Sequence, residues 1–254
     1  RDITSSVTLR QALAYTLDYE VLPRDFLLGH GERVYGYYGL GQWMAEEMKE
    51  DLEKMQPYTL DLDKATELLQ LDGWVYNLDG TPYDPSAGLR HKQIGDAFVP
   101  LSLVMAVTES NVAADLVAEM LSSSLEQIGG ELNVARMPLD QALRQYYRQE
   151  TRQFDLLFLG KNFTYLFDPT DAYLVGAAYQ GTMNTSGVQD RKLAQLAKNV
   201  TQDQPGNRNA YLRRWMEFQE YWSEVLPMIP LYGNTYYDLF TSDLVGYFPQ
   251  FYWN

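Results

Sequence analysis

The side chains that most often carry catalysis or metal binding are few in this sequence. Its 254 residues include no cysteine and only two histidines, His30 and His91. Without cysteine there is no thiol catalysis, thiolate metal site or disulfide. Neither histidine has a partner at metal-ligand spacing, and no His-Glu-x-x-His or Gly-x-Ser-x-Gly pattern occurs. The sequence therefore predicts no metal site, no cofactor and no catalytic residue.

Carboxylates are the one abundant group that could do acid–base chemistry. Asp and Glu number 34 against 20 Lys and Arg, a net charge of −14. We interpret most of them as solvated faces, but a hydrolase with a carboxylate pair stays open as an alternative. It would need two carboxylates about 5–10 Å apart in the deepest pocket. The same net negative charge disfavours nucleic acid and anionic lipid surfaces as partners, and we expect no nucleic acid or membrane partner.

Aromatic residues are the second unusual feature, at 14% of the chain, with 20 tyrosines. Rings of this kind either fill a core or give a large contact area to a ligand, and the composition leaves both readings open. Four of them lie in the segment Gly29–Trp43, which also contains five glycines. This segment predicts an irregular loop. It lacks the spacing of a dinucleotide or phosphate loop.

Helices and strands alternate along the middle of the chain. Apolar spacing and capping residues predict helices near 7–17, 44–55, 61–71, 111–128, 139–147, 189–199 and 207–226. Apolar runs predict strands at 101–107, 132–137, 154–159, 229–232 and 236–240, the third covered on both faces. The aromatic stripe of the long helix, Tyr211–Val225, is expected in the core. No linker divides the chain, so we expect one α/β domain over residues 1–254.

Several segments resemble the family 5 extracellular solute-binding proteins of ABC transporters. Residues 9–18, LRQALAYTLD, resemble the family's VRQALAYAIDR segment. Residues 58–69, YTLDLDKATELL, followed by Gly73-Trp74 and Asp79-Gly80, resemble its Y-x-x-D-x-x-K-A-x-x-L-L … GW … DG segment. The similarity spans the oligopeptide, dipeptide and nickel binders of that family.

Three later segments continue the resemblance in the family's order. Residues 125–129, LEQIG, resemble a helix end before a strand, and Phe154-Asp155 with Asp168-Pro169 resemble the FD … DP pair. Residues 224–232, EVLPMIPLY, resemble the E-x-P-x-I-P-L-Y segment after the long helix. The resemblance covers one lobe of the family fold. It implies a type II periplasmic-binding-protein-like lobe with a mixed sheet flanked by helices. We expect the chain to be the C-terminal, second lobe, with the first lobe absent.

The resemblance implies ligand capture without covalent chemistry. Two lobes close over a solute, and the closed form docks on an ABC permease. The implied solute is a peptide or peptide-like molecule, with an oligosaccharide or other uncharged solute as the alternative on the same fold. A monomeric, lipid-anchored or periplasmic protein outside the cytoplasmic membrane is expected. The protein is not expected to be an enzyme.

The resemblance also points to candidate ligand-binding residues in two loops. Tyr35, Tyr37, Tyr38 and Trp43 lie where the family places a ligand-proximal loop, although packing beneath that loop is the competing reading. The second loop carries Asn162, Phe163 and Tyr165, with Tyr165 where peptide binders hold an ammonium-binding Asp and Asn162 where they have Trp. This departure weakens the case for recognition of a free amine. Asn184 is expected to border the same cleft.

Overall fold

Most helices begin where the sequence places a capping side chain. The computed structural model describes residues 3–55, 58–202, 206–235 and 239–247. Helix α1 (Val7–Ala14) begins after Ser6, whose hydroxyl accepts a hydrogen bond from the Leu9 N–H. Asp and Asn side chains cap four further helices in the same way. These are α4 (Leu62–Leu71), α5 (Val112–Gln127), α7 (Arg191–Thr201) and α8 (Arg208–Val225), which follow Asp61, Asn111, Asp190 and Asn207.

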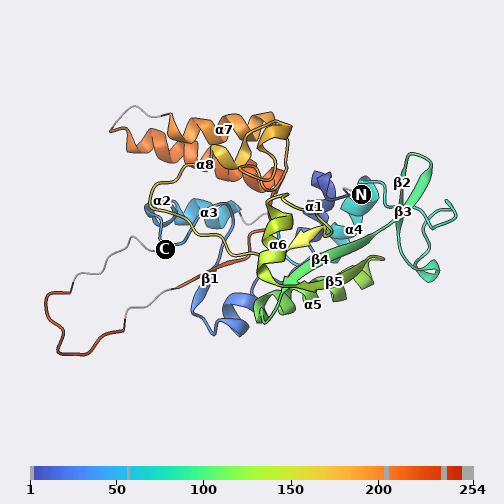
Figure 1. The fold of residues 1–254 in the computed structure, drawn as a ribbon, viewed down its shortest axis with the longest axis horizontal. Helices are drawn as coiled ribbons and strands as arrows, with labels where there is room; N and C mark the ends of the chain where they lie inside the picture. Colours follow the sequence, from blue (N-terminus) through green and yellow to red (C-terminus); the bar gives the residue numbers. More distant parts are fainter. Residues whose placement is uncertain (1–2, 56–57, 203–205, 236–238, 248–254) are drawn as a thin grey trace. The chain divides into compact units, whose positions relative to one another are not determined.

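The chain separates into two compact units, each made of three segments. Unit 1 comprises Arg1–Asp18, Tyr58–Leu159 and Gly176–Val188, and unit 2 comprises Tyr19–Pro57, Gly160–Val175 and Gln189–Asn254. Figure 1 shows the elements of both units. In chain order, the other short helices are η1 (Ile3–Ser5), η2 (Val21–Phe26), α2 (Trp43–Glu47), α3 (Lys49–Met55), η3 (Pro85–Ala87), α6 (Leu139–Tyr146), η4 (Asp171–Tyr173) and η5 (Ala177–Tyr179).

Unit 1 is built on a three-stranded parallel sheet. Strand β4 (Ser102–Thr108) lies between β5 (Glu131–Met137) and β6 (Leu156–Leu157). Helix α5 packs against β4 and β5, and α6 packs against β4. A small core of Ala106, Met137, Ala142 and Phe154 joins strand and helix. The α/β class is confirmed, and this sheet is parallel rather than mixed, because the antiparallel pairs of the described residues form separate two-stranded sheets.

Strand β6 is shorter than the sequence predicts. Only Leu156 and Leu157 pair with β4, and both are half-buried rather than covered on both faces. Asp155 precedes them, and its carboxylate Oδ2 accepts a hydrogen bond from the Val104 N–H at 2.8 Å. A side chain thus takes one of the pairing positions, and Leu159, already 39% exposed, lies outside the strand.

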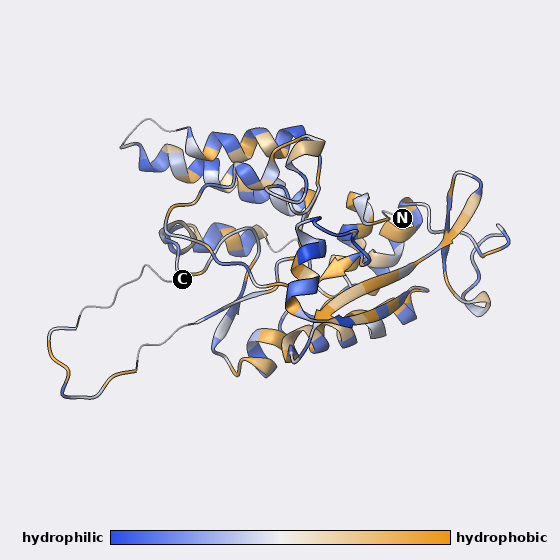
Figure 2. Ribbon diagram, in the orientation of Figure 1, coloured by the Kyte–Doolittle hydropathy of each residue, from blue (hydrophilic) through white to orange (hydrophobic). Residues whose placement is uncertain are grey.

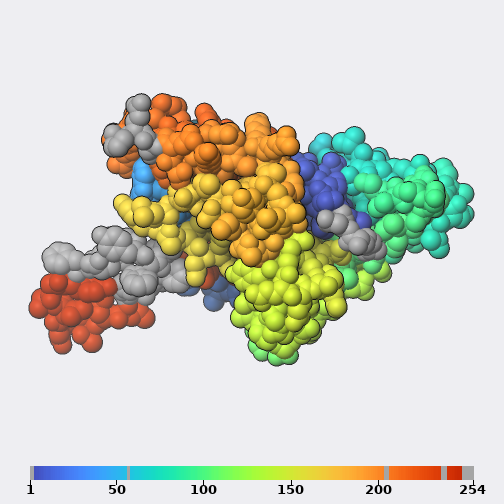
Figure 3. Space-filling model, turned by 45° about the horizontal axis from the view of Figure 1, so that its top comes forward, coloured from blue at the N-terminus to red at the C-terminus, as the bar shows by residue number. Residues whose placement is uncertain are grey.

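A β-hairpin in unit 1 was not predicted. Strands β2 (His91–Ile94) and β3 (Ala97–Pro100) pair antiparallel around Gly95, whose φ of +61° suits a tight turn. Figure 3 shows this region, in cyan to green, on the molecular surface. The two strands lack a clean apolar alternation, so the sequence carries only the weak turn signal of Gly95.

Unit 2 is held together by the antiparallel pair of long helices α7 and α8. The Asp190 carboxylate caps α7 through the Leu193 N–H and also accepts a hydrogen bond from the Tyr221 hydroxyl of α8 at 3.1 Å. Figure 2 shows both helices with alternating apolar and polar residues. Trp215, Phe218 and Trp222 are at most 1% exposed, which confirms that the α8 stripe is core. The predicted helix 44–55 is two helices, α2 and α3.

The strands at the end of the chain are partly described. Strand β7 (Tyr232–Asn234) lies just beyond the predicted strand 229–232 and pairs with β1 (Gly31–Arg33). The further predicted strand 236–240 begins outside the described residues.

Gly129 provides a test of packing in unit 1. It ends the turn after α5 with φ +83°, and a Cβ there would lie 2.8 Å from Tyr83 Cζ and 3.0 Å from Arg90 Cγ. Arg90 is buried, stacks on the Tyr83 ring at 4.0 Å and donates to the Ile128 carbonyl. We expect Gly129→Ala to lower the free energy of unfolding by about 2–4 kcal/mol, from left-handed strain plus overlap.

The matched control is Gly95→Ala, where φ is also positive but a Cβ meets nothing within 4 Å. It should cost about 1 kcal/mol from backbone strain alone. Urea denaturation of both variants measures the difference. Equal losses would mean that the contact of Gly129 with Tyr83 and Arg90 does not constrain the fold.

Candidate ligand-binding site

The glycine-rich segment of unit 2 starts as a strand rather than as an irregular loop. Gly31–Arg33 forms β1 against β7, and the pairing continues as the Val34 N–H donates to the Leu231 carbonyl at 3.2 Å. Gly233 is required here, because a Cβ on it would lie 2.8 Å from the Leu40 side chain. The partner strand is 200 residues away, so local sequence gives little sign of this pairing.

Tyr37 is a core residue of unit 2. It is 6% exposed, and its ring contacts Phe163, Tyr173 and Trp222 at centroid distances of 5.0, 5.5 and 5.7 Å. The fully buried Gln219 of α8 binds its backbone twice: the Tyr37 N–H donates to Oε1 at 2.7 Å, and Nε2 donates to the Tyr37 carbonyl at 2.9 Å. For Tyr37 the structure therefore supports the competing reading of the sequence, in which the ring packs beneath the loop.

Tyr38 is also buried, at 5% exposure, with its ring 5.8 Å from that of Trp215. Its hydroxyl accepts a hydrogen bond from the Tyr35 N–H at 3.2 Å. Burial raises the pKa of Tyr38 to about 12, so the hydroxyl is neutral at physiological pH. Tyr38 is thus a buried hydrogen-bonding group that packs beneath the loop, as the competing reading of the sequence has it.

Tyr35 and Trp43 are half-buried, and each is stacked with a cation. The Arg33 guanidinium lies 5.0 Å from the Tyr35 ring centroid and 4.1 Å from that of Tyr19. Trp43 stacks on Tyr211 at 5.5 Å, and the Arg208 guanidinium lies 4.7 Å from its ring. Part of each aromatic surface stays accessible, so these two residues remain candidates for ligand contact.

The second predicted loop, which carries Asn162, Phe163 and Tyr165, is largely exposed and is bonded to the glycine-rich segment. Asn162 is exposed, Tyr165 is 52% exposed, and Phe163 is half-buried against Tyr37. The buried amide of Gln42 joins this loop to the first, because Nε2 donates to the Thr164 carbonyl at 2.6 Å and Oε1 accepts from the Gly39 N–H at 3.1 Å. The structure therefore brings Asn162, Phe163 and Tyr165 together with the glycine-rich segment in unit 2.

Asn184 belongs to unit 1 and is fully buried. Its Oδ1 accepts from the Gly187 N–H and the Ser186 hydroxyl, both at 2.9 Å, and its Nδ2 donates to the Val188 carbonyl at 2.7 Å. These bonds shape its own turn, which is an ordinary use of an asparagine side chain. The amide points inward, contrary to the expected position at a cleft border.

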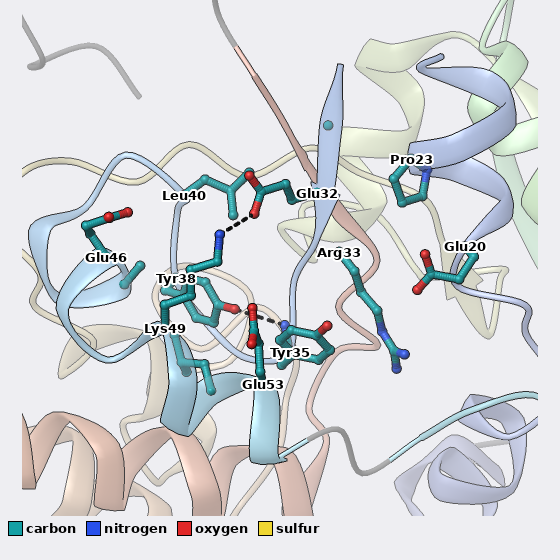
Figure 4. Close-up of a pocket in the computed structure, with 13 residues that line it drawn as sticks. Glu20, Pro23, Glu32, Arg33, Tyr35, Tyr38, Leu40, Glu46, Lys49 and Glu53 are labelled. Carbon is teal, nitrogen blue, oxygen red and sulfur yellow. Dashed lines mark hydrogen bonds and ion pairs between the residues drawn. The ribbon is translucent and has the colours of Figure 1, made fainter. Parts of the chain in front are cut away.

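A cavity of about 330 Å³ lies beside the glycine-rich segment in unit 2. Figure 4 shows Tyr35 and Tyr38 in its wall with charged side chains from β1, α2 and α3 and with Glu20, which directly precedes η2. The Lys49 ammonium pairs with the Glu32 carboxylate at 3.3 Å. Carboxylates outnumber cations among its charged residues, which are Glu20, Glu32, Arg33, Glu46, Lys49 and Glu53.

Sequence reasoning missed this cavity. Glu46 and Glu53 lie on the predicted helix 44–55, which the sequence indicates as a solvated face, and the adjoining strand β1 makes that face part of a wall. Within the described ranges, no group of three or more His, Asp or Glu side chains could hold a metal ion. The helices of these ranges also include none with the length and apolar character needed to cross a membrane.

Comparison with known proteins now decides the family. Residues 1–183 match the sequence profile of the bacterial extracellular solute-binding proteins, family 5. The chain belongs to this family. No curated protein matches its sequence.

Solved structures share the fold of this family 5 protein. The oligopeptide-binding protein AppA from Bacillus subtilis, in complex with a nonapeptide, is 17% identical with a TM-score of 0.72, over 92% of this chain and 43% of AppA. The oligopeptide-binding protein from Thermus thermophilus, with a pentapeptide, is 17% identical with a TM-score of 0.71, over 91% and 38%. NikZ from Campylobacter jejuni, in complex with Ni(L-His), is 17% identical with a TM-score of 0.69, over 92% of this chain and 43% of NikZ. The chain thus spans less than half of each of these proteins.

The Gln219 clamp gives a test of how the glycine-rich segment is held. We expect Gln219→Leu to lower the free energy of unfolding by about 2–4 kcal/mol, because it removes both side-chain hydrogen bonds to the buried Tyr37 backbone. Gln195→Leu on α7 is the control, since Gln195 is exposed and bonds only the nearby Asn199 side chain. Thermal and urea unfolding measure both. A loss below 1 kcal/mol for Gln219→Leu would show that the clamp is dispensable.

Proposed function

We propose that this family 5 protein captures a solute for an ABC importer, without covalent chemistry. The observation that carries the proposal is the family match over residues 1–183, together with a fold shared with proteins crystallised with peptides. The family binds solutes and is not catalytic. The charged cavity beside Tyr35 and the exposed Asn162–Tyr165 loop supply surface for recognition.

The proposed solute is a peptide or peptide-like molecule. Two of the similar structures hold peptides, and the accessible faces of Tyr35, Trp43 and Tyr165 suit apolar side chains. The alternative is an oligosaccharide, which the same rings would stack. A second alternative is a hydrolase with a carboxylate pair, and the observation that favours it is the four glutamates of the cavity. Turnover of the bound solute would support this alternative.

The proposal includes the setting of the protein. Docking on permease subunits, action as a monomer and a location outside the cytoplasmic membrane, in the periplasm or on a lipid anchor, follow from the family's role. The interpretation of residues 1–254 as one domain, the second lobe of a two-lobe binder, also belongs here. Its support is that the chain spans 43% of AppA.

The test begins with the full-length protein purified under native conditions. Native mass spectrometry should show a co-purified solute of peptide mass, and calorimetry should show saturable binding of that solute without turnover. A bound oligosaccharide would replace the peptide assignment. Absence of binding to both a peptide library and an oligosaccharide panel would refute solute capture.

The Tyr165 ring gives a residue-level test. We expect Tyr165→Ala to weaken solute binding about fivefold, because one aromatic contact contributes about 1 kcal/mol. Its exposure means that folding should be unaffected. Leu78→Ala is the control, an exposed apolar side chain in a turn of unit 1, and should leave the affinity unchanged. Equal affinity of the Tyr165→Ala variant and the wild type would remove this loop from the site.

A further inference from the structure

Lys161 extends from the loop of unit 2 that carries Asn162, Phe163 and Tyr165. Its Nζ lies 5.2 Å from the centroid of the Tyr37 ring, within the range of a cation–π contact. The residue is exposed, and Figure 3 shows the stretch that includes it, in yellow to gold, at the surface. The side chain as a whole is thus exposed, while its ammonium group lies beside a buried aromatic ring.

Two contacts that directly follow Lys161 in the chain hold its loop against the glycine-rich segment. Phe163 packs its ring edge-on against Tyr37 at 5.0 Å, and Gln42 holds the Thr164 carbonyl. The two loops approach so closely that a Cβ on Gly39 would lie 3.1 Å from Phe163 Cβ. A lysine on a segment fixed in this way loses less entropy on binding a ligand than one on a free loop.

Lys161, like Lys192 and Lys198, has no acidic partner in the part of the chain that the structure describes. Lys49, Lys54, Lys64 and Lys92 each pair with a carboxylate within 3.3 Å. Across the described ranges, Lys161 has neither an ion pair nor a hydrogen bond from its ammonium, although the chain carries a net charge of −14. The Asp168 carboxylate, which follows Lys161 in the sequence, accepts a hydrogen bond from the Thr170 N–H within its own turn.

Its surroundings also disfavour an unpaired charge. Partial burial lowers the pKa of Lys161, and no acidic neighbour raises it in compensation. A partly desolvated cation next to rings gains more from an anion than a fully hydrated one does, because the local dielectric is lower. A carboxylate would restore the lost solvation through a charge-assisted hydrogen bond.

We propose that Lys161 binds a carboxylate group of the captured solute. The inference rests on the proposed function and specifies its substrate class: a solute with an anionic end at this loop and apolar groups beside it. Leu166 is 81% exposed and Tyr165 52%, so both offer apolar contact next to the cation. A ligand ammonium would be repelled at this position. The carboxylate can come from a peptide or from a sugar acid.

The experiment measures Kd by calorimetry for the full-length protein and three variants. The ligands are two matched pairs: peptides with a free C-terminal acid or its amide, and a uronic-acid oligosaccharide or its neutral analogue. The variants are Lys161→Met, Lys161→Arg and the control Lys198→Met, an exposed lysine of α7. The first result to evaluate is whether the wild type binds at least one of the four ligands. Such binding establishes solute capture independently of Lys161.

We expect the wild type to bind the acid of one pair at least tenfold more tightly than its neutral partner. Lys161→Met should abolish that preference and leave the neutral ligand's Kd unchanged, Lys161→Arg should retain it, and Lys198→Met should match the wild type. The pair that shows the preference identifies the peptide or the sugar acid as the source. Equal binding of acid and neutral ligands by the wild type, or an unchanged preference in Lys161→Met, would overturn the assignment while leaving solute capture intact.

Discussion

One buried amide organises the candidate site in unit 2. Gln219 on α8 is fully buried and satisfies both backbone groups of Tyr37. Because a buried peptide group without partners is costly, this pair of bonds fixes the glycine-rich segment against the helix. A Cβ on Gly36 would reach the Gln219 Oε1, so the glycine before Tyr37 is part of the same arrangement. The other contacts of the glycine-rich segment depend on this attachment of Tyr37 to Gln219.

The aromatic core extends the clamp to the second loop. With the Tyr37 backbone held, its ring meets Phe163 from the 160–168 loop and Trp222 from α8. Gln42 adds a second amide bridge between the two loops. Side chains that look like ligand contacts in the sequence therefore divide into two groups. Tyr37 and Tyr38 support the loops from within, and Asn162, Tyr165 and Lys161 remain outside.

Charge distinguishes the two accessible surfaces of unit 2. The cavity beside Tyr35 is rich in glutamate, with Lys49 already paired to Glu32. The Lys161 loop instead presents a cation without an acidic partner among the described residues. A solute receptor needs polar groups at defined positions to orient its ligand within an otherwise apolar contact. The cavity is net negative and the Lys161 loop carries a positive charge, so each surface could orient a ligand group of the opposite charge.

The sequence by itself determined the local elements and the family. Capping residues such as Ser6, Asp61, Asn111 and Asp190 placed the helix starts, because their side chains bond the first free N–H groups of the same helix. The α8 stripe was correctly assigned to the core from its spacing. Motif order alone identified the family that the profile match shows. Helix caps, apolar spacing and sequence motifs each involve residues that are close together in the chain, so the sequence alone reveals them.

The tertiary structure alone decided which rings are buried and where the site residues lie. Tyr35 and Tyr37 are two residues apart, yet one is half-buried and the other lies in the core, because Gln219, 182 residues later, binds the second. Asn184 was expected at a cleft, but its amide closes its own turn. Strand β1 depends on β7, and the two-residue β6 depends on the Asp155 carboxylate. Pairings over such distances have no local periodicity, so only the folded chain reveals them.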